Sequence, residues 1–396
     1  MNNKAKYLFK PIIGEYDHIL YFQEGLAFVR NNCEEFKVGY IDKTGEVAIP
    51  LEYYGRYGDL NDRPKFVHSP FNDGLAPLIN KDGKFGYLDK KGKVVIPFEY
   101  ENTNWFTEGL AAVKKDEKWG FINKKGEVVI PLVYDWVFCF QDGLAPARKH
   151  GKLGYIDNTG KTVIPFEYNI WEGFPGGFSE GLTPVEKNGK KGYIDKMGKV
   201  VIPLELEYDV IGGFCNGVAS VAIGKGPEIP MLKDESEEDY FKRYHALNDQ
   251  RWGFIDKTGK ITIPIEYESI LGFSEGLFIV VKDGKARYID HNGNVPFATD
   301  FDGLSGFYEG FARVKKENKY GYIDKTGKVV IPIEYEDARH FKEGYASVKK
   351  DGKYGLIDKT GSVIVPLEYD SAGLLNEGLS VVKKDGKWGI VHIETE

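Results

Sequence analysis

Two pentapeptides in the chain have the form of a catalytic serine turn. The sequence GFSEG occurs twice, with Ser179 and Ser274 at its centre, and G-x-S-x-G is the form of the nucleophile elbow in α/β-hydrolases. That elbow requires a turn from a strand into a helix. Here the same turn recurs with Lys342 or Asn376 in the serine position. We therefore interpret both serines as exposed turn residues, and we expect Ser-to-Ala variants to keep the fold and any activity.

A recurring aspartate is the next candidate for chemistry, because its carboxylate could bind a metal ion. It follows a pair of residues such as Y-I in most parts of the chain. The positions are Asp42, Asp89, Asp157, Asp195, Asp256, Asp290, Asp324 and Asp358. Each offers a single carboxylate, whereas calcium requires six or more oxygen ligands. We expect these side chains to accept backbone N–H bonds in a turn, and we predict no metal and no cofactor.

The histidines and cysteines show no spacing typical of a catalytic or metal site. None of the seven histidines lies in an H-E-x-x-H motif, and we expect most of them to be exposed. The three cysteines, Cys33, Cys139 and Cys215, are too far apart for a C-x-x-C site. Without a disulfide framework we expect a reduced, cytoplasmic setting, and we predict that the chain is not an enzyme.

A recurring glycine shows that these positions belong to a repeat. It follows Glu, Asp or Asn and precedes an apolar word, as in EGLAAV. The ten glycines are Gly25, Gly74, Gly109, Gly143, Gly181, Gly217, Gly276, Gly310, Gly344 and Gly378. The basal spacing of 34 residues is typical of a tandem-repeat protein. We number the repeats one to ten by these glycines.

One repeat predicts three short strands. In the eighth repeat, 311–316 alternates apolar and polar residues, 320–324 is rich in aromatic and β-branched residues, and 329–335 reads VVIPIEY. The glycine of KTGK suits the hairpin turn between the second and third strands. A segment with no helical period, which we call the crossing segment, then leads to the next repeat.

A proline interrupts the third strand-like word in every repeat. The ten prolines, of eighteen in the chain, are Pro11, Pro50, Pro97, Pro131, Pro165, Pro203, Pro264, Pro296, Pro332 and Pro366. Because proline cannot donate a ladder hydrogen bond, it is confined to edge strands and bulges. We therefore expect the third strand to be an edge strand or to leave the sheet at the proline.

The pair that opens the second strand carries a family resemblance. It is Trp-Gly at 119–120, 252–253 and 388–389, and Phe or Tyr replaces the tryptophan in other repeats. Together with GYIDKTGKVVIP, this pair resembles the bacterial WG-repeat (KWG-repeat) family. The resemblance implies a β-rich repeat array without established catalytic residues. Arg287 stands where one glycine belongs, and we expect some close packing to be lost there.

These patterns predict an all-β fold, a tandem array of about ten three-stranded antiparallel repeats. The chain begins with a third strand at 7–17 and ends with first and second strands at 379–393. Such ends suit either an open array with unmatched caps or a ring closed by its first strand. We expect an open, curved superhelix or solenoid, with a closed propeller-like ring as the alternative.

Two insertions interrupt the repeats, at 55–70 and 224–250. The second contains apolar residues on one helical face after acidic residues, which predicts a short amphipathic helix at 234–248. The expected organisation is therefore 1–223 with repeats one to six, the insertion 224–250, and 251–396 with the rest of repeat six and repeats seven to ten.

Composition excludes some classes of partner. The net charge of −7 is spread along the chain, and no clustered basic face suggests nucleic acid. The longest apolar run, at 277–281, is far too short to span a membrane.

Our leading hypothesis for function is a non-catalytic protein-interaction scaffold. A glycan-binding module that uses exposed aromatic residues is the alternative, and an enzyme with an unrecognised site is the third possibility. Trp105, Trp136 and Trp171 lie in three consecutive crossing segments and could line one rim of the array. We predict that they contact a protein or glycan partner, although each ring could instead cover the edge of its own repeat.

Overall fold

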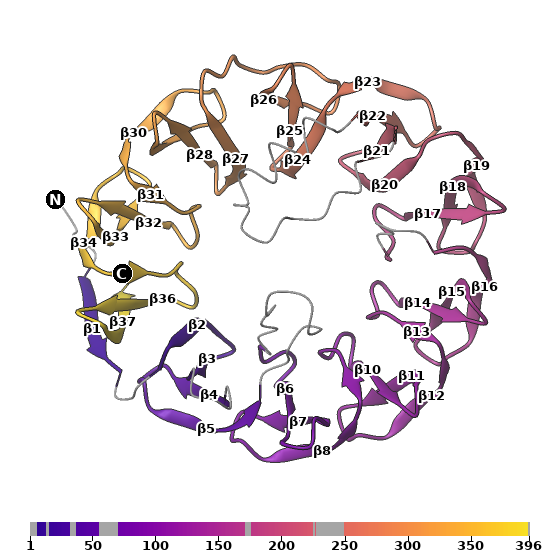
Figure 1. Cartoon of the computed structure of the whole chain (residues 1–396), viewed down its shortest axis with the longest axis horizontal. Coiled ribbons are helices and arrows are strands. Elements are labelled where there is room, and N and C mark those ends of the chain that lie inside the picture. Colours follow the sequence, from indigo (N-terminus) through magenta and orange to yellow (C-terminus); the bar gives the residue numbers. More distant parts are fainter. Residues whose placement is uncertain are drawn as a thin grey trace. The chain divides into compact units, whose positions relative to one another are not determined.

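Every regular element in the described part of the chain is a β-strand (Figure 1). The expected all-β class is therefore confirmed. The structure is a computed structural model. It describes residues 6–12, 16–31, 37–54, 70–170, 176–224, 226 and 249–394. The helix expected at 234–248 lies outside these residues.

Each repeat begins with an antiparallel pair of strands. The first strands are β3 (Leu26–Arg30), β6 (Leu75–Ile79), β10 (Leu110–Lys115), β14 (Leu144–Lys149), β17 (Leu182–Lys187), β21 (Val218–Ile223), β25 (Leu277–Lys282), β28 (Phe311–Lys316), β32 (Tyr345–Lys350) and β36 (Leu379–Lys384). The second strands are β4 (Lys37–Asp42), β7 (Phe85–Asp89), β11 (Lys118–Asn123), β15 (Lys152–Asp157), β18 (Lys190–Asp195), β22 (Arg251–Asp256), β26 (Lys285–Ile289), β29 (Lys319–Ile323), β33 (Lys353–Asp358) and β37 (Lys387–Glu394).

The proline-bearing third strand follows the second strand as predicted. These strands are β5 (Val47–Tyr54), β8 (Val94–Tyr100), β12 (Val128–Tyr134), β16 (Thr162–Tyr168), β19 (Val200–Leu206), β23 (Ile261–Tyr267), β30 (Val329–Tyr335) and β34 (Val363–Tyr369). All but β5 lie at the edge of their sheet, and β5 meets β6 through the single pair Tyr54–Ile79. The predicted edge position of the third strand is thus confirmed.

The crossing segment adds a strand that sequence analysis did not predict. It precedes the first strand in most repeats, as in the sheet order β9-β10-β11-β12. These added strands are β2 (His18–Gln23), β9 (Asn102–Thr103), β13 (Trp136–Val137), β20 (Val210–Cys215), β24 (Ser269–Ser274), β27 (Gly303–Tyr308), β31 (Asp337–Ala338) and β35 (Ser371–Ala372). Several are only two residues long, too short to show a period of their own.

The chain divides into two compact units. One comprises Met1–Gly151, Tyr155–Thr162 and Glu334–Glu396, and the other comprises Lys152–Gly154 and Val163–Ile333. The first unit therefore contains both ends of the chain, and the second contains the middle repeats. The organisation expected from sequence, with an insertion at 224–250, stays a prediction, although β21 and β22 on either side of that insertion pair as a regular hairpin.

The glycine of the WG pair and the proline of the third strand form one structural feature. In the third repeat, the register shifts between Trp119 and Phe121, and Pro131 of β12 falls in the resulting bulge. Gly120 faces this bulge, and a Cβ on Gly120 would lie 2.5 Å from the Ile130 carbonyl oxygen. The bulge tolerates a proline because it needs no ladder N–H there. The close approach of the two strands in turn requires glycine.

The seventh repeat shows what happens without that glycine. Arg287 occupies the position in β26, and the residues from 290 to 302 form no strand. No third strand forms in this repeat, and the segment from the hairpin glycine to the proline is also shorter here, Gly293 to Pro296 against Gly126 to Pro131. Phe297 instead packs against Tyr288, with ring centroids 5.4 Å apart. The expected loss of close packing at Arg287 stays a prediction.

The hydrophobic core runs between neighbouring repeats. Ile96, at the bulge of β8, is fully buried and lies against Gly126 in the hairpin of the next repeat. It belongs to a cluster that combines Tyr87 of its own repeat with Phe106 and Ile122 of the next. A single repeat buries only part of this surface, so neighbours supply the remaining core.

A carboxylate in the turn before several of the first strands also joins neighbouring repeats. Glu180 accepts a hydrogen bond from the Gly217 N–H at 3.1 Å and forms an ion pair with Lys257 at 3.0 Å. Both partners belong to the next repeat. We call this contact the carboxylate link. Equivalent bonds join Glu24 to Gly74, Glu108 to Gly143, Glu275 to Gly310 and Glu343 to Gly378.

The first strand of the chain completes the last repeat. The strand β1 (Lys6–Pro11) pairs antiparallel with β37, from Lys6 opposite Glu394 to Pro11 opposite Gly389 (Figure 1). The partial repeats at the two ends of the sequence therefore form one sheet, β1-β37-β36-β35. The pairing of the first strand with the last repeat is therefore observed. The open, curved superhelix stays a prediction.

Candidate binding surfaces

Two of the three predicted surface tryptophans lie in the described residues. Trp105 precedes the buried Phe106 in its crossing segment, and 43% of Trp105 is exposed. Trp136 is half-buried in β13 and stacks on Phe138, with ring centroids 6.1 Å apart and an interplanar angle of 17°. Trp171 lies outside the described residues. The two described tryptophans occupy consecutive crossing segments but are not stacked on each other.

The crossing segments carry other exposed apolar side chains that were not predicted from the sequence. Each segment carries an aromatic or leucine residue three positions before the recurring glycine, and Phe106 and Phe140 at this position are buried. Exposed side chains lie close to it in the chain. They are Tyr21, Trp105, Phe138, Ile170, Leu271 and Tyr308, and Phe273 is exposed at the recurring position itself. Their proximity to the recurring buried residue is a signal that the sequence contains.

The tryptophans of the WG pairs are engaged within their sheets. Trp119, Trp252 and Trp388 are half-buried. The indole N–H of Trp388 donates to the Tyr16 carbonyl at 2.7 Å, and the Lys383 ammonium lies 5.1 Å from the Trp388 ring centroid. These rings therefore support the sheet edge and are poor candidates for ligand contacts.

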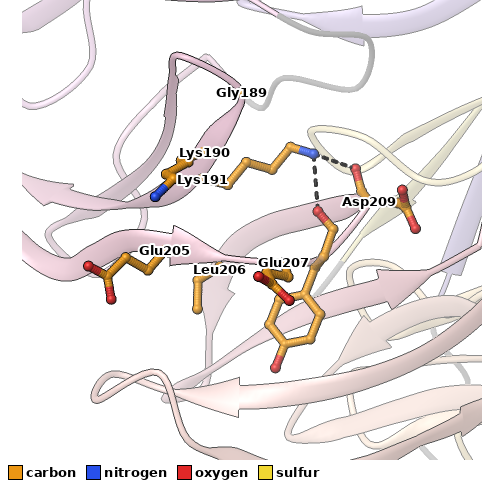
Figure 2. Close-up of a pocket in the computed structure, with 8 residues that line it drawn as sticks. Gly189, Lys190, Lys191, Glu205, Leu206, Glu207 and Asp209 are labelled. Carbon is orange, nitrogen blue, oxygen red and sulfur yellow. Dashed lines mark hydrogen bonds between the residues drawn. The ribbon is translucent and has the colours of Figure 1, made fainter.

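A groove of about 590 Å³ opens in the fifth repeat (Figure 2). It is lined by Gly189, Lys190, Lys191, Glu205, Leu206, Glu207, Tyr208 and Asp209. In the third repeat, Trp119 lies opposite Tyr134 at the corresponding position. Here Lys191 lies opposite Leu206. The fifth repeat therefore lacks the aromatic pair that the third repeat has at this position.

Two charged side chains in the groove form hydrogen bonds to the backbone. The Lys191 ammonium donates to the carbonyl oxygens of Tyr208 at 3.1 Å and Asp209 at 2.8 Å (Figure 2). The Asp209 carboxylate accepts the Gly224 N–H at 2.8 Å. No serine, cysteine or histidine lines the groove. The groove can accommodate a polar group.

The serines of the two GFSEG turns connect neighbouring repeats. The Ser179 hydroxyl donates to the Phe214 carbonyl and the Ser274 hydroxyl donates to the Phe307 carbonyl. Both serines are half-buried. The expectation that they are exposed turn residues was wrong, because the turn faces the next repeat rather than water. Their hydroxyl protons are engaged in structure, which agrees with rejecting a nucleophile elbow.

The recurring aspartate stabilises the hairpin turn, as predicted. Asp157 Oδ1 accepts bonds from the Thr159 N–H at 2.9 Å, the Thr159 hydroxyl at 2.6 Å and the Lys161 N–H at 3.0 Å. The bond from the Thr159 hydroxyl is the largest influence that lowers the pKa of Asp157 below its ordinary value. Within the described ranges, no three His, Cys, Asp or Glu side chains are placed to hold a metal ion.

Comparison with known families identifies the repeat. The family described as the WG containing repeat matches residues 8–32, 39–55, 85–119, 119–152, 154–190, 192–225, 252–285, 287–320, 320–354 and 354–388. The chain belongs to the WG-repeat family. The resemblance seen in the Trp-Gly pairs is thus confirmed over most of the sequence. No curated protein matches this WG-repeat chain.

Two solved structures share a distant similarity with this WG-repeat chain. BamB from Moraxella catarrhalis is 11% identical, with 98% of this chain and 100% of that chain covered and a TM-score of 0.36. Dihydro-heme d1 dehydrogenase NirN in complex with DHE is 14% identical, with 92% and 78% covered and a TM-score of 0.36. In the described part of this chain, no helix has the length and apolar character needed to cross a membrane.

Proposed function

We propose that the chain is a non-catalytic scaffold that binds another protein through the crossing segments of repeats three to five. The observation that supports this proposal is the exposure of Trp105 at 43% and Phe138 at 48% on consecutive repeats. Exposed aromatic residues are enriched at protein contacts, and tryptophan is a frequent anchor. Trp171 occupies the next crossing segment and is part of the proposal.

The neighbouring contacts hold these rings in place before binding. The Trp136 ring stacks on the Phe138 ring. The short strand β13 is itself fixed by pairing of Trp136 with Arg148 and of Val137 with Ala147. A contact surface that is already ordered loses less conformational entropy on binding. We propose that the partner is a protein in the cytoplasm.

The test compares partner capture by three forms of the full chain. The double variant Trp105→Ala, Phe138→Ala removes the exposed rings, and Val128→Ala removes an equally exposed apolar side chain from β12, away from the crossing segments. We expect proteins retained from the source cell by the wild type and by Val128→Ala to be lost by the double variant. Equal thermal midpoints would show that all three are folded. Retention of the same proteins by the double variant would contradict the proposal.

A glycan is the second candidate, because the exposed indole of Trp105 offers a flat apolar face. Sugar rings stack on such faces through their C–H groups. A glycan array with the wild type and Trp105→Ala separates the two proposals. Binding of one glycan class by the wild type, lost in the variant, would favour the glycan over the protein partner.

A further inference from the structure

The strand β1 occupies a place that other repeats fill through a hairpin. In the third repeat, the turn at 124–127 joins β11 directly to β12. The strand β1 instead reaches β37 from the opposite end of the chain. No hairpin turn therefore joins β1 to the strand that it pairs with.

The contacts around β1 are those that any repeat makes with its successor. Glu377 of the last repeat accepts the Gly25 N–H at 3.0 Å and forms an ion pair with Lys43 at 2.8 Å. This is the carboxylate link, with the last repeat acting on the first. Ile12 lies against Gly45 in the first hairpin, as Ile96 lies against Gly126. The junction therefore needs a third strand in the β1 position.

The strand β1 forms a continuous ladder with β37, while side chains in its middle stay exposed. Leu8 is 60% exposed and Phe9 is 38% exposed. Ile12, directly after β1, is 7% exposed and packs into the cluster of the first and last repeats. Third strands such as β8 bury residues at two positions, Ile96 and Tyr100. A strand that pairs through its backbone ladder can be replaced by another strand of the same register.

We propose that the outer edge of β37 is a strand-acceptor site and that β1 from a second copy of this chain can occupy it. The second copy brings an identical sequence, so it reproduces the register from Lys6–Glu394 to Pro11–Gly389. Exchange of an identical element conserves the contacts that it breaks, and it is a low-cost route to a dimer. Two chains would then associate by exchanging their first strands. This inference is independent of the proposed partner surface.

The test uses two chains that each carry one cysteine. Leu8 lies opposite His392 in the ladder, and both side chains are exposed. In full-length chains with Cys33, Cys139 and Cys215 replaced by serine, one form carries Leu8→Cys and the other carries His392→Cys. The two forms are mixed over a wide range of concentrations and oxidised. We expect a mixed disulfide-linked dimer whose yield rises with concentration.

A mismatched pair provides the control. Lys387 is exposed but lies opposite Lys384 of β36, beyond the end of β1. A mixture of Leu8→Cys and Lys387→Cys chains measures random collision. We expect the matched pair to yield several-fold more mixed dimer than the mismatched pair. If the two pairs gave the same yield at every concentration, the proposal would be overturned.

A double variant checks the starting structure. A chain with both Leu8→Cys and His392→Cys should form an internal disulfide at low concentration, which shows a folded molecule with β1 in register. At high concentration, part of this bond should become intermolecular. An internal bond alone at every concentration, or no bond at all, would overturn strand exchange.

Discussion

At the residue scale, the glycine of the WG pair permits the close approach of the second and third strands. Gly120 and Gly253 each face a carbonyl oxygen at the bulge of the neighbouring strand. In the seventh repeat Arg287 replaces this glycine, and no third strand forms there. The first residue of the pair varies widely in size, from Trp to Ala286. The steric demand at the glycine is therefore stricter than the packing demand at its neighbour.

The first prediction concerns this glycine. A Cβ at Gly253 would lie 2.7 Å from the Ile263 carbonyl oxygen. We expect Gly253→Ala to lower the free energy of unfolding by about 3 kcal/mol, because the bulge has to shift. Gly272→Ala is the matched control, since nothing lies within 4 Å of its Cβ position, and we expect a change within about 0.5 kcal/mol. Urea unfolding measures both; equal effects would contradict the steric account.

The second prediction revises the role of the turn serines. Because the Ser274 hydroxyl donates to the Phe307 carbonyl, Ser274→Ala should destabilise the fold by about 1 kcal/mol. Ser362, an exposed hairpin residue, serves as the control, and Ser362→Ala should change stability by less than about 0.5 kcal/mol. Thermal unfolding distinguishes them. An unchanged midpoint for Ser274→Ala would restore the view that the residue has no structural role.

At the element scale, the carboxylate link makes the junction between repeats sensitive to acid. Partial burial raises the pKa of Glu180, but bonds from Lys257 and Gly217 outweigh it and lower the pKa below the ordinary 4.5. A carboxylate whose pKa is lower in the folded state stabilises the fold above its unfolded pKa. That stabilisation is lost as the pH falls through the folded pKa. The pKa values of Glu275 and Glu377 are lowered in the same way.

The third prediction follows from that sign. Glu180→Gln should be less stable than the wild type at pH 7 by about 1 kcal/mol, because it loses the charge that binds Lys257. The difference should shrink as the pH falls through the lowered pKa of Glu180, where the wild-type carboxylate becomes protonated. Glu207→Gln, which alters a groove residue outside the link, should show no such convergence. Thermal midpoints measured from pH 7 to pH 3 test this, and a difference independent of pH would argue against the ion pair.

At the scale of the whole molecule, the two ends of the chain depend on each other. Ile12 packs with Ile19 and Phe22 of the first repeat and with Leu379 and Ile390 of the last. The apolar cluster thus includes residues from both termini. Loss of its packing should destabilise strands at both ends of the sequence.

The fourth prediction measures this dependence. Ile12→Ala should destabilise the junction by about 2–3 kcal/mol, because a buried isoleucine is lost. Hydrogen exchange should accelerate together in β37 and β4. Leu8→Ala, at an exposed position of the same segment, should leave exchange in both strands nearly unchanged. Acceleration confined to β37 would show that the two ends are not coupled through Ile12.

Local patterns in the sequence determined the repeat and its strands. The alternation of apolar and polar residues, the turn glycines and the Asp157-type turn act over a few neighbouring residues, so a single repeat displays them. The proline of β12 required an edge or a bulge for a reason present in the residue itself, its missing N–H. The two-residue strands of the crossing segments escaped prediction because β9 and β13 are shorter than any periodic pattern.

Only the tertiary structure decided which side chains serve the junctions and which are left exposed. Ser179, Glu180 and their partners lie one repeat apart, and β1 meets β37 across almost the whole chain. The exposure of Trp105 likewise depends on how neighbouring repeats pack. A residue type states what a side chain can bond, but its burial and its partner are set by segments distant in sequence, since the free energy of folding comes from their packing.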